Sequence, residues 1–103
     1  MKVDNNAING FKEYLISEER CQGTIAKYLH DVTAFSLWLA DRNITKENLS
    51  EWKEYLQSNG YEASTINSML AAVHTFCRFY ELDIKVKFMK IQRKIFREEK
   101  RVN

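Results

Sequence analysis

Residues 24–35 read TIAKYLHDVTAF, and residues 65–76 read TINSMLAAVHTF. Each stretch begins with Thr-Ile and places apolar residues 3, 4, 7 and 10 positions after the Ile. This spacing follows the 3.6-residue period of an α-helix, so the apolar side chains share one face. The two stretches therefore predict two helices of similar design, each of which buries one face in a common core.

Hydroxyl residues stand at the predicted starts of both helices, Thr24 in the first and Ser64 and Thr65 in the second. A helix start has unpaired backbone N–H groups and the positive end of the helix dipole, so it can hold an anion such as a backbone phosphate. Ser and Thr are also ordinary helix N-caps. The residues alone leave both interpretations open, phosphate binding and simple capping.

The rest of the chain extends this helical pattern to an all-α four-helix bundle. The 103 residues include no Pro and only three Gly, and 45% of them are hydrophobic, which is typical of one globular domain. Thr45 is predicted as the N-cap of the third helix, and Ser58-Asn59-Gly60 as its stop. The other three helices are predicted at about residues 4–18, 24–41 and 64–83.

From Ile84 to Phe88 the period changes to two, because apolar residues alternate with Lys85 and Lys87. This alternation predicts an extended segment, which lies along the bundle, pairs with something absent, or leads to another domain. Charge divides the chain at the same point: residues 1–84 hold 8 Lys/Arg and 12 Asp/Glu, whereas residues 85–103 hold 8 and 2. We expect a helical domain over 1–84 and, over 85–103, a basic linker suited to a polyanion.

Several functional classes are disfavoured. No apolar run is long enough for a membrane span and no secretion signal opens the chain, so we expect a cytoplasmic protein without a membrane partner. The metal-binding candidates are Cys21, His30, His74 and Cys77, and only the last two share a helical i, i+3 spacing. The chain has no Gly-rich phosphate loop and no G-x-S-x-G. We therefore expect no metal, no cofactor and no catalytic residues in this chain.

The order of these motifs over residues 7–97 resembles the core-binding domain of tyrosine recombinases, also called phage or transposon integrases. The residues that resemble it are Phe11-x-x-Tyr14-Leu15, Thr24-Ile25-x-x-Tyr28-x-x-Asp31-Val32-x-x-Phe35-x-x-Trp38-Leu39, Ile44-Thr45, and Ser64-Thr65-Ile66-Asn67-x-x-Leu70-Ala71-Ala72-Val73-x-x-Phe76-x-x-Phe79-Tyr80. Lys90-Ile91-Gln92-Arg93-Lys94 resembles the linker that joins such domains to their catalytic domain. That linker commonly contains Pro, which this chain lacks.

The resemblance implies a four-helix bundle that forms half of a C-shaped clamp on double-stranded DNA, with its second and fourth helices against the major groove. It also implies as partners the catalytic domain of the same parent chain and further recombinase protomers on the DNA. The catalytic residues of the family lie in that other domain, so the resemblance assigns none here. Asn67 is the polar residue best suited to an adenine edge. The positions that the resemblance places near DNA are Thr24, Lys27, Tyr28, Ser64, Thr65, Asn67, Ser68, Lys90, Arg93, Lys94 and Arg97.

The residues also allow a second interpretation, a small helical module that binds another protein. Trp38, Tyr61 and Phe88 would then act as exposed aromatic anchors. The excess of acidic residues over residues 1–84 favours this alternative.

Overall fold

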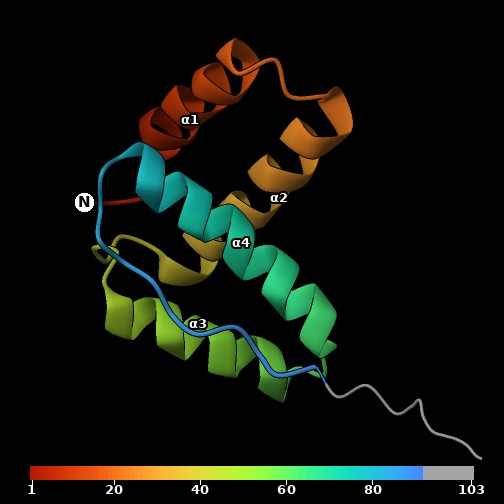
Figure 1. Cartoon of the computed structure of the whole chain (residues 1–103). Coiled ribbons are helices and arrows are strands. Elements are labelled where there is room, and N and C mark those ends of the chain that lie inside the picture. The colour runs from red at the N-terminus through yellow and green to blue at the C-terminus, as the bar shows by residue number, and fades with distance from the viewer. Residues whose placement is uncertain (92–103) are drawn as a thin grey trace, which may run out of the picture.

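The computed structural model describes residues 1–91, which form a bundle of four helices followed by an extended segment (Figure 1). The predicted all-α class is confirmed for this part of the chain, where the only β-type pairing is one isolated bridge between Lys2 and Asn43. Arg93, Lys94, Arg97 and the rest of the predicted linker beyond residue 91 lie outside the described residues. The helices are α1 (Asn5–Ser17), α2 (Gln22–Leu39), α3 (Lys46–Ser58) and α4 (Ala63–Phe79).

The core is built around α4, which contacts each of the other three helices. The apolar stripe predicted for this helix is fully buried, as expected for a helix with neighbours on several sides. In α2 only the second half of the predicted stripe is buried, through Val32, Phe35 and Leu39. Ile25, Tyr28 and Leu29 are only partly covered. The N-terminal half of α2 therefore stands further from the core than the repeated sequence pattern predicts.

Two helix starts are capped by side chains and two are not. Asp4 accepts a hydrogen bond from the Ala7 N–H at 2.8 Å, and Thr45 accepts one from the Asn48 N–H at 3.0 Å, so the predicted cap of α3 is confirmed. The cap positions of α2 and α4 are Cys21 and Glu62, and neither side chain forms a cap hydrogen bond.

Of the two interpretations left open for Thr24, Ser64 and Thr65, simple N-capping is therefore wrong. Helices α2 and α4 begin at Gln22 and Ala63, earlier than predicted, so the three hydroxyl residues lie inside the first turn. An N-cap must have non-helical backbone angles just outside the helix, and these residues are helical.

After α4 the chain turns back and runs as an extended segment over residues 82–91, which we call the return segment. Figure 1 shows it in blue, running along α3 and ending close to the start of α4. Residues 82–91 form neither helix nor strand, and the segment lies along the bundle, which is the first of the three predicted paths. Ile84, Val86 and Met89 pack against the core cluster.

Candidate nucleic-acid interface

The starts of α2 and α4 both lie at the right-hand side of the molecule in Figure 1. Ser64, Thr65 and Ser68 are exposed at the start of α4, and Thr24 is half-buried in the first turn of α2. Because no side chain caps either helix, their first N–H groups and dipole ends are available to an anion from solvent. The two helix starts that carry the predicted hydroxyl residues thus lie toward one side in Figure 1, the start of α2 at its top and the start of α4 at its bottom.

Thr24 already has a neighbour, since its Oγ1 lies 3.1 Å from the Sγ of Cys21. Hydrogen bonding from Thr24 lowers the pKa of the exposed Cys21 thiol below its ordinary value. The other cysteine, Cys77, is buried in α4, and loss of solvation raises its pKa to about 12. The start of α2 therefore holds a thiol with a lowered pKa beside a predicted DNA-contacting residue.

Lys27 is held by a carboxylate on its own helix. Its Nζ forms an ion pair with Asp31, which is only 2% exposed, and His30 Nδ1 lies 3.4 Å from the other oxygen of that carboxylate. A buried carboxylate needs such partners, so Lys27 has a structural role. Tyr28 is half-buried, with its ring 6.5 Å from that of Phe11.

Asn67 is bonded to the return segment. Its Oδ1 accepts a hydrogen bond from the Met89 N–H at 2.6 Å, and its Nδ2 donates one to the Met89 carbonyl at 3.0 Å. A side-chain amide can satisfy both groups of one residue because it presents an acceptor and a donor side by side. The amide of Asn67 is thus used within the protein, and contact with an adenine edge would require it to leave Met89.

Two further side chains hold the return segment. The Nε2 of His74 accepts a hydrogen bond from the Val86 N–H at 3.2 Å, and the His74 ring stacks on Phe88 with centroids 5.6 Å apart. Lys53 in α3 donates from Nζ to the Lys87 carbonyl at 2.6 Å. Together with Asn67, these residues place the backbone of the return segment at three points along its length.

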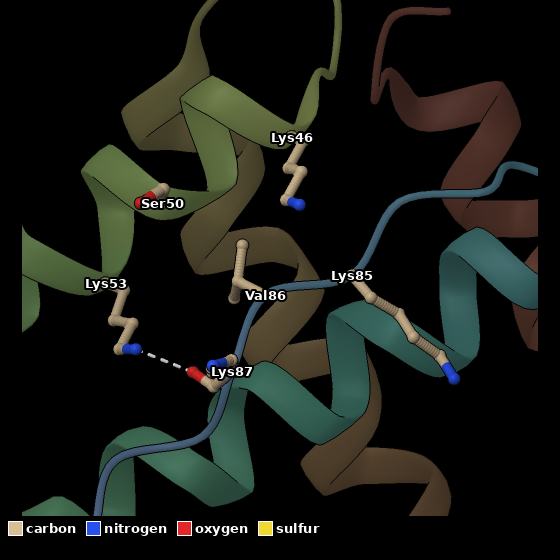
Figure 2. A pocket seen from close by; sticks show the side chains of 6 residues that line it. All are labelled: Lys46, Ser50, Lys53, Lys85, Val86 and Lys87. Atoms are coloured by element: carbon tan, nitrogen blue, oxygen red, sulfur yellow. Dashed lines mark hydrogen bonds between the residues drawn. The ribbon is translucent and has the colours of Figure 1, made fainter.

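The lysines of the return segment are exposed, at positions 85, 87 and 90. Two of them adjoin α3 and form with it a groove of about 490 Å³, which we call the lysine groove. In Figure 2, Lys46 and Lys53 extend from α3 toward the return segment, whereas Lys85 extends away across α4. The groove is lined by Lys46, Ser50, Lys53, Lys85, Val86 and Lys87.

Sequence reasoning did not find this groove. The available signal was the i, i+4, i+7 spacing of Lys46, Ser50 and Lys53, which places them on one face of α3. That spacing could not show what the face would meet, because the return segment is more than 30 residues away in sequence.

Other site types find no support in the part of the chain that the structure describes. Within residues 1–91, no three His, Cys, Asp or Glu side chains come close enough together to hold a metal ion. Among the same residues, no helix is both long and apolar enough to cross a membrane.

Comparison with known proteins identifies relatives of this chain. The family model of the phage integrase N-terminal SAM-like domain matches residues 8–82. The tyrosine recombinase XerD of Rickettsia conorii is 33% identical over 75 residues, which are 67% of this chain and 24% of that protein. The tyrosine recombinase XerA of Thermococcus kodakarensis is 28% identical over 90 residues, 87% of this chain and 31% of that protein. No solved structure matches significantly. The chain spans about a quarter to a third of the length of these two relatives.

Proposed function

Because the chain belongs to the family of phage integrase N-terminal SAM-like domains, we propose that it is the DNA-binding domain of a site-specific tyrosine recombinase, which clamps the core-site duplex for DNA integration or recombination. Family membership also confirms the resemblance to tyrosine recombinases over residues 8–82. The proposed domain is non-catalytic by itself. The strand-exchange chemistry would belong to a catalytic domain of the same parent chain.

One observation supports this proposal most directly. The two helices that start without a side-chain cap are the two that share the repeated sequence pattern, and both starts lie on one side of the bundle. Backbone phosphates bind well at such starts, because the unpaired N–H groups and the helix dipole both favour an anion. Exposed hydroxyl groups of Ser64, Thr65 and Ser68 add hydrogen-bond donors at the start of α4.

The proposal gives the predicted residues different roles. Thr24, Ser64, Thr65 and Ser68 contact phosphates, and Lys90 contributes charge next to the start of α4. Lys27 and Tyr28 line the start of α2, where Lys27 shares its charge with Asp31. Asn67 acts by holding Met89 and with it the neighbouring Lys90. Arg93, Lys94 and Arg97 remain predicted phosphate contacts outside the described residues.

The proposed partners are double-stranded DNA, the catalytic domain of the parent chain and other recombinase protomers bound to the same DNA. Most of the proposed contacts go to phosphates, which position a protein on the duplex without reading its sequence. We therefore expect the isolated domain to bind many duplexes with similar affinity.

The test is a titration of the labelled 103-residue chain with a generic DNA duplex, followed by backbone amide NMR and fluorescence anisotropy at several salt concentrations. Neutralising about five phosphates predicts a slope of log affinity against log salt of about −4.5. Amide shifts should concentrate at residues 24–28 and 64–68. A slope near zero, or shifts elsewhere only, would exclude the proposal.

A matched pair of variants sharpens this test. Thr65→Glu places a carboxylate in the first turn of α4, where the dipole stabilises it, so the fold should persist while a phosphate is repelled. Asn9→Glu makes the same charge change at an exposed position of α1. We expect a loss of affinity of about tenfold or more for Thr65→Glu and little change for Asn9→Glu.

The predicted alternative, a protein-binding module, has one surface in its favour. Leu37 on α2 is 78% exposed and lines a shallow groove with Trp38, Tyr55 and Tyr61. We propose another recombinase protomer as the partner of this groove. Phe88, the third predicted anchor, is 49% exposed, and its ring also stacks on His74. Sedimentation of the chain with and without DNA tests this function, and Leu37→Lys should abolish any self-association that appears.

A further inference from the structure

The lysine groove concentrates positive charge on a domain that is otherwise acidic. Residues 1–84 hold more Asp and Glu than Lys and Arg, yet four lysines line this one groove. Within residues 1–91, the ion pairs are those of Asp31 with Lys27 and His30 and the pair of Arg42 with Glu51. None of the groove lysines has a carboxylate partner there. Their charges are therefore balanced by solvent ions or by a bound anion.

Lys46 does not stabilise its own helix. It is the first residue of α3, where the positive end of the helix dipole disfavours a cation. Its side chain extends into the groove toward the return segment (Figure 2). An anion in the groove would offset this unfavourable placement, because it would bind the Lys46 ammonium at the start of α3, where Thr45 caps the helix and Glu47 lies in the first turn.

The groove is held in shape by hydrogen bonds to the backbone of the return segment. Lys53 binds the Lys87 carbonyl at 2.6 Å across the groove, and Asn67 binds both backbone groups of Met89. These contacts fix the Lys87 backbone relative to α3 before any ligand arrives. Pre-positioned donors lose less conformational entropy on binding than donors on a flexible tail.

The dimensions of the lysine groove suit an extended polyanion better than a small molecule. Lys46 and Lys53 are seven residues apart on α3, which corresponds to about 10 Å along the helix axis. The groove is open, and its polar side chains are lysine ammoniums and the Ser50 hydroxyl, which can all donate to phosphate oxygens. From the groove, the exposed lysines of the return segment continue to Lys90, which follows the Met89 that Asn67 of α4 binds.

We propose that the lysine groove is a second phosphodiester-binding site, which takes backbone phosphates of the DNA whose first contacts are the starts of α2 and α4. This inference rests on the proposed function and extends it to α3. The ammonium groups of Lys46, Lys53 and Lys87 provide the charge, and the Ser50 hydroxyl donates a hydrogen bond. Lys53 also keeps its bond to the Lys87 carbonyl.

The test compares two double variants of the 103-residue chain that lose the same charge. Lys46→Gln with Lys87→Gln removes two groove cations and leaves Lys53 and the backbone contacts in place. Lys2→Gln with Lys12→Gln removes two exposed lysines, neither of which lines the groove. Salt dependence of duplex binding is measured by anisotropy, and amide shifts are followed by NMR.

We expect the groove variant to reduce the magnitude of the salt slope by about two, since each lost phosphate contact lowers it by about one. The control variant should change the slope by much less. In the unaltered chain, the amides of Lys46, Ser50 and Lys87 should shift with duplex. Equal effects of the two double variants, or no shift of the groove amides, would overturn the inference.

Two further outcomes separate this inference from the proposed function. If duplex shifts residues 24–28 and 64–68 while the groove amides and the slope stay unchanged, the second site is absent and the proposed function stands. If duplex shifts no residue, both fail. Titration with inorganic phosphate is the last arm: saturable shifts of the groove amides with phosphate but none with duplex would make this a small-anion site and overturn the inference.

Discussion

The Asn67 side chain forms two hydrogen bonds with the backbone of Met89, 2.6 Å to its N–H and 3.0 Å to its carbonyl. This pairing ties the return segment to the first half of α4. It also fixes the backbone of the return segment close to residue 91, where the described part of the chain ends. The same contact therefore links the stability of the segment to its proposed role as part of the DNA-binding surface.

Asn67→Ala should open the return segment locally without unfolding the bundle. Two hydrogen bonds are lost, each worth about 0.5–1.5 kcal/mol, so the amide of Met89 should exchange with solvent roughly ten- to a hundredfold faster. Ser68→Ala removes a neighbouring exposed hydroxyl and should leave that exchange rate unchanged. Hydrogen exchange followed by NMR measures both. An unchanged Met89 rate in Asn67→Ala would show that the amide does not hold the segment.

The hydrogen bond from the Val86 N–H to His74 should make the return segment sensitive to acid. Burial, followed by the charges of Lys85 and Arg78, lowers the pKa of His74 below its ordinary value of 6.5. The unfolded chain therefore binds a proton at higher pH than the folded chain does. The stabilising contribution of neutral His74 is complete above about pH 6.5 and is lost as the pH falls through the lowered pKa.

Chemical denaturation between pH 7.5 and pH 5 measures this loss. The Gln side chain in His74→Gln does not titrate. This variant should therefore lose the part of the pH dependence of the free energy of unfolding that comes from His74. The Val86 amide shift should titrate together with the His74 ring, because a protonated Nε2 can no longer accept a hydrogen bond. If the Val86 shift is constant while the ring titrates, the hydrogen bond is not the cause of the pH dependence.

The two cysteines should react very differently. Cys21 is exposed and its thiol pKa is lowered, chiefly by the Thr24 side chain, whereas Cys77 is buried with a pKa raised to about 12. Because the thiolate is the reactive form, one equivalent of iodoacetamide should modify Cys21 in the folded chain and spare Cys77. Thr24→Val should slow the reaction several-fold, and Thr33→Val, elsewhere on α2, should not. Equal labelling of both thiols, read by mass spectrometry, would contradict this expectation.

Alkylated Cys21 offers a second readout of the proposed function. A bulky group at the cap position of α2 should weaken duplex binding, because it covers the N–H groups proposed to hold a phosphate. Anisotropy of labelled and unlabelled chain measures the change. Full affinity after complete labelling would argue against a phosphate at the start of α2.

Gly10→Ala should destabilise the bundle although it improves helix propensity. A Cβ at Gly10 would lie 2.5 Å from the hydroxyl oxygen of Tyr80, which donates a hydrogen bond to the Ala7 carbonyl and packs against Phe76 and Phe79. We expect a loss of about 1–3 kcal/mol in the free energy of unfolding, because the ring must shift or give up its hydrogen bond.

Gly23→Ala is the matched control, since a Cβ there meets nothing within 4 Å and the residue is also helical. It should be neutral or stabilise by up to about 1 kcal/mol. Urea denaturation compares the two variants. Equal stabilities of Gly10→Ala and Gly23→Ala would show that Tyr80 can move without cost.

The helices and their buried faces could be predicted from the sequence because these features depend on neighbours three or four residues away. The repeated stripe of α2 and α4, the Thr45 cap and the Gly60 stop, where φ is +85°, are all local patterns. Propensity and periodicity operate on that scale, and the family resemblance rests on the same spacings. The extended conformation after α4 followed from a local period as well.

Only the tertiary structure decided what these elements meet. Asn67 joins a residue 22 positions away, Lys53 one 34 positions away and Tyr80 one 73 positions away. No local pattern contains such separations, because they depend on how the chain packs once its helices exist. For this reason the sequence could not show that Asn67 binds Met89, and it missed the lysine groove. It also left open a capping role for hydroxyl residues that in the folded chain lie inside the first turns of α2 and α4.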